Sequence, residues 1–259
     1  MSLINLTKTA QITLEKKGIL SEKVQVILAL DYSYSMRSLY EKGVVDNIVK
    51  ELLAIGLNID IDQSIEVYTF GKNPRHIGQV TQDNHENFVA NHIRTQEYES
   101  STFYANILNL IAQDAGTSTI EHVDYVEKAS TKLFGRLFGK TTTEKVVTTM
   151  PNPNPPKVPT LVFFLTDGDC FDENLSREAI RITSTQPIFW QFVGIGDTSF
   201  RFLSELDENV KGRSVDNANF FQLNDIAHVS PSELYDRILN EFPQWLIESR
   251  KLGITPPQN

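Results

Sequence analysis

The sequence is poor in cysteine, since Cys170 is the single one among 259 residues. One thiol cannot form an internal disulfide, so the fold does not depend on an oxidising compartment. No residue beside Cys170 in the sequence is an evident base that would activate it as a thiolate. We therefore expect a packing role for this side chain.

Long apolar runs and basic segments are missing as well. No stretch approaches the roughly 20 apolar residues that span a bilayer, and residues 1–8 lack the basic start and apolar core of a signal peptide. The formal net charge of −9 argues against the basic surface that nucleic-acid-binding proteins present. We expect a cytoplasmic protein with no membrane span and no nucleic-acid partner.

What is present is the composition of an ordinary globular protein, with 40% hydrophobic and 22% charged residues. The length suits one large α/β domain or two small ones. A strong apolar segment resumes at Thr160, directly after the proline-rich stretch 151–156. We therefore interpret 1–259 as a single domain, with 1–22 as an N-terminal extension and 114–158 as an insertion that contains a proline-rich surface loop.

Short apolar segments alternate with segments of helical spacing along the chain. We expect strands at 24–30, 65–70, 76–80, 160–165, 187–193 and 220–223, and helices at 9–17, 36–57, 84–93, 102–111, 123–138, 177–183, 200–206 and 232–246. The runs at 24–30 and 160–165 are almost uniformly apolar, which is typical of strands buried on both faces of a parallel sheet. The order predicts an α/β fold of Rossmann-like type: a doubly wound, mainly parallel six-stranded sheet with helices on both faces and one antiparallel edge strand.

The first core strand ends in Asp31-Tyr32-Ser33-Tyr34-Ser35. Ligands bind at the carboxyl ends of strands in open α/β sheets. A carboxylate and two hydroxyls on one tight loop make a cradle for a hard cation such as Mg²⁺, Mn²⁺ or Ca²⁺. Taken alone, the same pattern also fits a strand-to-helix turn in which Asp and Ser only cap the helix.

Two further oxygen-bearing side chains occupy comparable places. Asp167 follows the second core strand, and Thr102 opens a predicted helix. If the two strands are neighbours where the strand order reverses, these side chains converge in one crevice with Asp31, Ser33 and Ser35. Two carboxylates would offset a divalent charge and three hydroxyls would fill much of an octahedron. One position would stay open for water or for a carboxylate of a partner.

This pattern resembles the von Willebrand factor A (vWA) domain and its metal-ion-dependent adhesion site (MIDAS), which reads D-x-S-x-S, then T, then D. The likeness covers nearly the whole chain and includes the strand end Leu165-Thr166-Asp167-Gly168 and the turn Val193-Gly194-Ile195-Gly196-Asp197. Within the family, residues 6–8, 28–37, 195–197 and 200–203 look most like the tellurium-resistance (TerF-type), copine-like branch.

The resemblance implies a metal site and a class of partner. The five ligands that it implies are the hydroxyls of Ser33, Ser35 and Thr102 and the carboxylates of Asp31 and Asp167. Asp169 would be a neighbour rather than a ligand. The cofactor would be a divalent cation, with Mg²⁺ first and Ca²⁺ or Mn²⁺ as alternatives. The partner would be a protein that offers an acidic side chain to the metal, in a context of stress or toxic-ion resistance.

Three features depart from the family pattern. Tyr34 stands where glycine is frequent, and Ser100 and Ser101 precede Thr102 where glycines are common. Glycine allows close backbone approach, so this bulk would narrow access to the metal or change which partner fits. The insertion 114–158 would cover or extend the binding face.

Two other functions remain open at this point. A Mg²⁺-dependent phosphoryl-transfer enzyme also uses an aspartate after a buried strand. However, Ser33 occupies the place of the second acid, and the sequence has no G-x-x-x-x-G-K-[ST] loop, no G-x-S-x-G elbow and no obvious histidine base. The other alternative is a vWA domain whose metal site is vestigial and which binds partners through its insertion. We expect a binding module and no enzyme.

Overall fold

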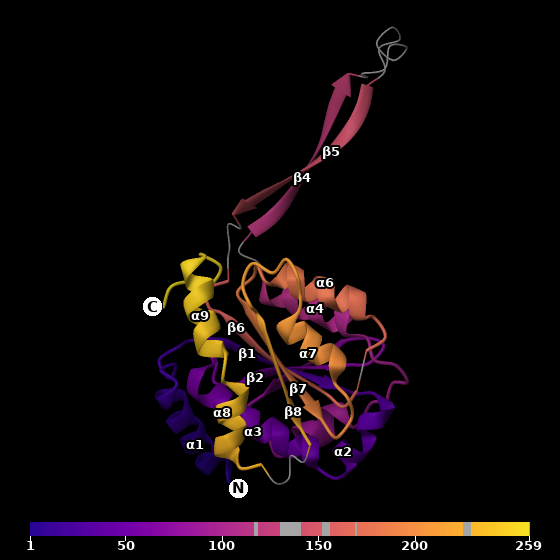
Figure 1. Ribbon diagram of the computed structural model, residues 1–259. Coiled ribbons are helices and arrows are strands. Elements are labelled where there is room, and N and C mark those ends of the chain that lie inside the picture. Colours follow the sequence, from indigo (N-terminus) through magenta and orange to yellow (C-terminus); the bar gives the residue numbers. More distant parts are fainter. Residues whose placement is uncertain (117–118, 130–140, 152–155, 169, 225–228, 259) are drawn as a thin grey trace.

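The computed structural model describes residues 1–116, 119–129, 141–151, 156–168, 170–224 and 229–258, with the backbone alone for 119–129 and 141–151. Its centre is a six-stranded sheet in the order β3-β2-β1-β6-β7-β8. The strands are β1 (Gln25–Asp31), β2 (Ile65–Phe70), β3 (Arg75–Val80), β6 (Thr160–Thr166), β7 (Ile188–Ile195) and β8 (Ala218–Leu223). Only the edge pair β2–β3 is antiparallel among these strands. The predicted fold class is confirmed (Figure 1).

Strand β1 shows why helices cover both faces. Val26, Leu28 and Leu30 belong to one apolar core, whereas Ile27 and Ala29 belong to the other, because successive side chains of a strand point to opposite faces. The first core is completed by α1 (Leu3–Lys16), α3 (Val44–Ile59), α8 (Pro231–Ile238) and α9 (Phe242–Lys251), with the π-helical turn η2 (Val89–Ile93). The second is completed by α4 (Tyr104–Ala115), α6 (Glu173–Thr183) and α7 (Arg201–Glu208).

Two of the predicted helices are interrupted. The segment 36–57 consists of the 3₁₀ turn η1 (Tyr34–Met36), the short helix α2 (Arg37–Glu41) and α3. Between α2 and α3 the chain turns at Gly43, whose φ of +72° favours glycine. The segment 232–246 is divided into α8 and α9, and Pro243 stands at the start of α9. Apolar spacing continues across both breaks, so it predicted one helix in each place.

The N-terminal helix also differs from the prediction. It begins at Leu3 rather than Thr9, and the Ser2 side chain caps it by accepting the N–H of Asn5 at 3.4 Å. Its buried side chains, among them Leu6 and Leu14, pack against α3 and α8. Among the described residues, no helix has the length and apolar content needed to cross a membrane.

The helix predicted over 123–138 is wrong where the structure describes it. Strand β4 (Thr119–Ala129) pairs antiparallel with β5 (Thr141–Pro151), and together they form a separate two-stranded sheet. Strand β5 lies within the insertion 114–158 and ends at Pro151, the first residue of the proline-rich stretch. β5 is rich in Thr and Val, the branched residues that favour strands. Residues 130–138 of the predicted helix and 152–155 of the proline-rich loop lie outside the described residues.

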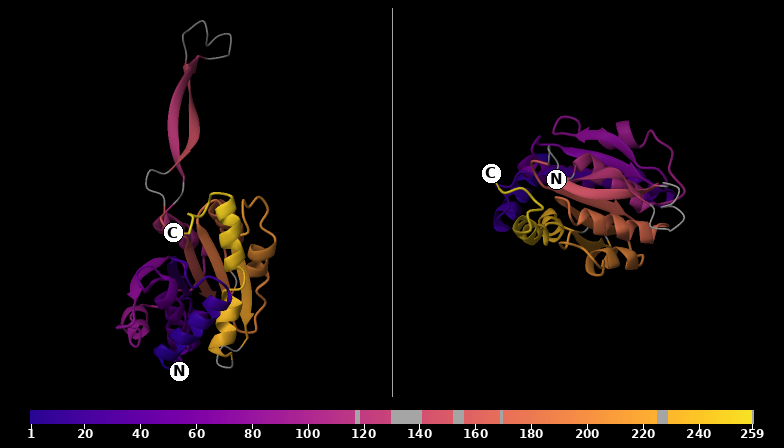
Figure 2. Two further views of the ribbon diagram at one scale, coloured as in Figure 1. Left: turned by 90° about the vertical axis from the view of Figure 1, so that its left-hand side faces the viewer. Right: turned by 90° about the horizontal axis from the view of Figure 1, so that it is seen from above.

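This hairpin projects from the end of the central sheet where β6 begins (Figures 1 and 2). Asp31 and Asp167 stand at the other end, where β1 and β6 finish. Gly116 and Pro156, which stand on either side of the hairpin within the insertion, lie together, since a Cβ on Gly116 would be 3.4 Å from Pro156 Cγ. The described part of the insertion therefore does not cover the end of the sheet where Asp31 and Asp167 stand, contrary to the expectation from the sequence.

Candidate metal centre

Asp31 is the last residue of β1, and its side chain is fully buried. Oδ1 accepts the N–H of Ser33 at 2.8 Å, and Oδ2 accepts the hydroxyl of Thr166 at 2.6 Å. Burial raises the pKa of Asp31 to about 6, although both hydrogen bonds lower it, and the negative charge of Asp167 raises it further. The two hydrogen bonds hold the carboxyl in one orientation.

A chain of side-chain oxygens leads from the β1 loop to Asp167. The hydroxyls of Ser33 and Ser35 lie 3.0 Å apart, and Ser35 donates to Oδ1 of Asp167 at 2.8 Å. Burial raises the pKa of Asp167, and the hydrogen bond from Ser35 opposes that rise. Ser33 is buried whereas Ser35 is exposed, so the chain of oxygens runs from the interior to the surface. Because β1 and β6 are adjacent parallel strands, their ends bring these four side chains together.

Thr102 lies at the same end of the sheet, two residues before α4, and is 7% exposed. Its segment runs beside the Ser33 loop, since Ser33 pairs with Glu99 in a parallel bridge and the Tyr34 N–H donates to the Glu99 carbonyl at 2.8 Å. The Thr102 carbonyl accepts the N–H of Phe171 at 3.0 Å. In the described part of the chain, the Thr102 hydroxyl forms no hydrogen bond with the other four candidate ligands. The structure therefore places the segment that contains Thr102 beside these ligands, without a direct contact between the side chains.

Carboxylates alone do not make a metal site here. The described residues contain no group of three or more His, Cys, Asp and Glu side chains that could hold an ion. A cation at this end of the sheet would therefore depend on the hydroxyls beside Asp31 and Asp167. All the candidate donors are oxygens, which fits a hard divalent cation. Asp169, the neighbour expected from the sequence, lies outside the described residues.

Two residues that support this end of the sheet were missed by the sequence analysis. The Thr166 hydroxyl donates to Asp31. Its position between an apolar run and Asp167 was the one feature of the sequence that could have indicated this role. Glu99 accepts the backbone N–H groups of Lys72 and Asn73, the second at 2.9 Å. Gly71 allows this approach, because a Cβ there would come within 2.7 Å of the Glu99 Cβ. No sequence pattern singles out Glu99.

Tyr34, one of the departures from the family pattern, borders the group at the surface. Its side chain is 63% exposed. Its hydroxyl accepts a hydrogen bond from Arg37 at 3.3 Å, and the Arg37 guanidinium carbon lies 5.8 Å from the ring centroid. The bulky Tyr34 side chain therefore stands next to Ser33 and Ser35 and is exposed to solvent.

Comparisons with known families and proteins cover nearly the whole chain. The family model of the vWA domain found in the TerF C terminus matches residues 23–255. The chain is also 30% identical, over 259 residues and 92% of the relative's length, to the uncharacterized protein YcbR of Bacillus subtilis strain 168.

Solved structures of proximal thread matrix protein 1 from the mussel byssus have the same fold. One superposes with a TM-score of 0.53 at 14% identity, and another, which has a zinc-occupied MIDAS motif, with 0.51 at 13%. Each match covers 84% of this chain and 47% of the other, so this chain spans about half the length of those proteins. With the TerF-type model matched from residue 23 to residue 255, the chain belongs to the vWA family, in its TerF-like group.

Proposed function

We propose that this chain is a protein-binding module that acts through a divalent cation held at the ends of β1 and β6. The observation that carries the proposal is the linked set of oxygens of Asp31, Ser33, Ser35 and Asp167, which reaches from a buried carboxyl to the surface. The zinc-occupied MIDAS motif of a structural neighbour supports a metal at the corresponding place.

The five oxygen donors would hold the ion: Asp31, Ser33, Ser35, Thr102 and Asp167. When bound, the cation supplies a positive charge with a free coordination position for an acidic side chain. Because the set contains no sulfur or nitrogen donor, Mg²⁺, Mn²⁺ or Ca²⁺ fits better than a softer metal. We place Mg²⁺ first.

The cellular setting is a further part of the proposal. The name TerF in the description of the matching family supports a role in tellurium or toxic-ion resistance. We propose that the chain acts in the cytoplasm, where it would join a protein partner through an acidic side chain. Binding rather than catalysis is the proposed role of the metal.

The proposal is tested by calorimetric titration of the metal-stripped protein with Mg²⁺, Mn²⁺ and Ca²⁺. We expect saturable binding of one ion per chain, lost in Asp31→Ala and weakened to a lower but measurable affinity in Thr102→Ala. Thermal unfolding in EDTA serves as the control that the variants fold. Equal binding by the wild-type protein and both variants would place any metal elsewhere and overturn the site.

The open coordination position has its own test. Mn²⁺ is titrated in the presence of acetate or of the same concentration of chloride. If a carboxylate joins the bound ion, acetate strengthens the apparent Mn²⁺ affinity by linkage. Mn²⁺ binding that is insensitive to acetate would support the metal site and contradict recognition of an acidic side chain.

A further inference from the structure

We infer that Asp172 is a positioning residue that sets Thr102 for metal binding by capping α4 from a neighbouring helix. This inference rests on the function proposed above. Asp172 is the N-cap residue of α6, yet its side chain caps no N–H of that helix. Its carboxylate is directed instead to α4: Oδ1 accepts the N–H of Tyr104 at 2.9 Å, and Oδ2 accepts the N–H of Ala105 at 3.0 Å.

Helix α4 depends on this outside carboxylate. Phe103 occupies its own N-cap position and has no side-chain oxygen to offer. The first N–H groups of a helix have no partner within the helix, so they need acceptors from elsewhere. A negative charge at this end is also favoured by the helix dipole. Asp172 supplies both, and its two oxygens fix the direction in which α4 begins.

The contacts of residues 171 and 172 with the start of α4 also fix the position of Thr102. The Thr102 carbonyl accepts the N–H of Phe171 at 3.0 Å, so residues 171 and 172 together form three hydrogen bonds with 102–105. On the other side, the Phe103 N–H donates to the Gly71 carbonyl at 2.9 Å. Thr102 is thereby tied to the loop that follows Asp167. The two segments that carry these candidate ligands are joined by main-chain contacts.

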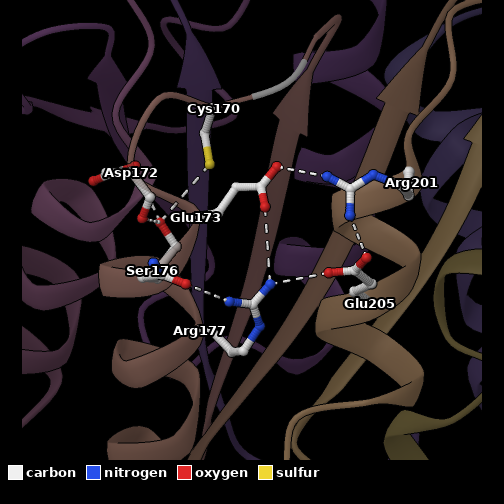
Figure 3. Close-up of polar contacts among 8 residues, drawn as sticks. Cys170, Asp172, Glu173, Ser176, Arg177, Arg201 and Glu205 are labelled. Atoms are coloured by element: carbon white, nitrogen blue, oxygen red, sulfur yellow. Dashed lines mark hydrogen bonds and ion pairs between the residues drawn. The ribbon is translucent and has the colours of Figure 1, made fainter.

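Asp172 is itself held in place. The Ser176 hydroxyl, one turn further along α6, lies 3.1 Å from Oδ1 of Asp172 and 3.0 Å from its carbonyl (Figure 3). Helix α6 is joined to α7 by ion pairs between Arg177 and Glu205 at 3.0 Å and between Glu173 and Arg201 at 2.8 Å (Figure 3). The carboxylate that caps α4 therefore stands on a supported helix end.

The test compares Mn²⁺ affinity of the full chain in wild-type, Asp172→Asn, Thr102→Ala and the double variant. Asn keeps the size of Asp but turns one acceptor into a donor that faces an N–H. Asp60→Asn is the matched control, because Asp60 also accepts several backbone N–H groups, including that of Val26 at 2.7 Å, but lies at the opposite end of β1. Thermal unfolding in EDTA is measured for every variant.

We expect Asp172→Asn to weaken Mn²⁺ binding by roughly 10- to 100-fold, the size typical for loss of a group that orients a metal ligand without binding the metal itself. Asp60→Asn should lower thermal stability and leave Mn²⁺ affinity within about twofold, which separates positioning from general destabilisation. If Asp172 acts through Thr102, the double variant binds no more weakly than Thr102→Ala alone.

Two results would overturn the inference while leaving the metal site in place: wild-type affinity in Asp172→Asn, or additive losses in the double variant. A wild-type protein that binds no Mn²⁺ would overturn the proposed function and this inference together. This outcome differs from the two above, in which the wild-type protein still binds Mn²⁺. If Asp172→Asn does not fold, Asp172→Ser is used. Its single oxygen retains one capping acceptor, and we expect an affinity between those of the wild-type protein and Thr102→Ala.

Discussion

The hydroxyl of Ser35 lies 2.8 Å from Oδ1 of Asp167, although 132 positions separate the two residues in the sequence. The contact joins the loop after β1 to the end of β6. Ser35 is exposed, so the hydrogen bond contributes little to folding. Its place among the candidate ligands gives Ser35 a second, separate role in the proposed cation site.

Ser35→Ala should separate these two roles. We expect the free energy of unfolding without metal to change by less than about 0.5 kcal/mol, as for other exposed positions. Mn²⁺ affinity should fall by roughly tenfold or more, at least as much as for loss of a group that only supports a ligand. Ser38→Ala, at an exposed position on α2, is the control for calorimetry. A similar affinity in both variants would contradict Ser35 as a ligand.

Thr166→Val tests the buried partner of Asp31. The Thr166 hydroxyl donates to Asp31 at 2.6 Å, and valine keeps the shape without the donor. The loss should cost about 1–3 kcal/mol of unfolding free energy, because a buried carboxyl is left with one acceptor unpaired. Thr160→Val is the control on the same strand, where the contact with Gln25 is 3.5 Å long. Equal costs in guanidinium unfolding with EDTA would argue against a special role for the Thr166 bond.

Asp207 should make stability depend on pH. Burial raises its pKa to about 7, and the charges of Glu241, Asp216 and Glu208 add to this, although the Phe220 N–H bond lowers it. Since the folded state binds the proton more tightly than the unfolded state, the contribution of this group to stability falls as pH rises from about 4 to about 7. Asp207→Asn should therefore flatten the pH profile and be more stable than the wild-type protein at pH 8.

Denaturant unfolding at pH 5 and pH 8 checks this expectation. The difference between Asp207→Asn and the wild-type protein should be larger at pH 8 than at pH 5. Asn can still accept the N–H of Phe220, so the comparison isolates the charge. A difference that is constant with pH would show that the carboxyl titrates near its ordinary value.

Replacement of residues 117–155 by a short Gly-Ser linker should leave the central domain folded. Gly116 and Pro156 already lie together, and β4 and β5 form a sheet of their own. Mn²⁺ affinity should stay within about twofold of the full chain, since the hairpin projects from the end away from Asp31. Loss of Mn²⁺ binding in the shortened protein, with its unfolding transition retained, would contradict this separation.

The sequence was a good guide to the sheet and to the place of the candidate ligands. Uniformly apolar runs before Asp31 and Asp167 are a strong signal because burial on both faces of a sheet leaves little room for polar residues. The position of Asp31 at the end of such a run follows directly from this pattern. The order of neighbouring strands then brings Ser35 and Asp167 together.

Other features depend on contacts that leave no mark in local spacing. The break between α2 and α3 needs only one residue with positive φ, Gly43. The spacing of apolar residues carries no information about the φ of a single residue, so it did not predict the break. Asp172 escaped notice because its partners are backbone N–H groups 67 and 68 positions away, and backbone donors are the same at every residue. Strand β4 was mistaken for part of a helix, since its mixture of Val, Tyr and charged residues fits both periods over a few turns.

The hairpin also affects how the size of this protein is measured in solution. Each of its strands has 11 residues, which gives the ribbon a length of about 35 Å, while a compact chain of this length has a radius of gyration of about 18 Å. Such a molecule diffuses more slowly than a sphere of 29.4 kDa. A monomer should therefore elute earlier in gel filtration than a compact protein of its mass, so its mass must be determined by light scattering.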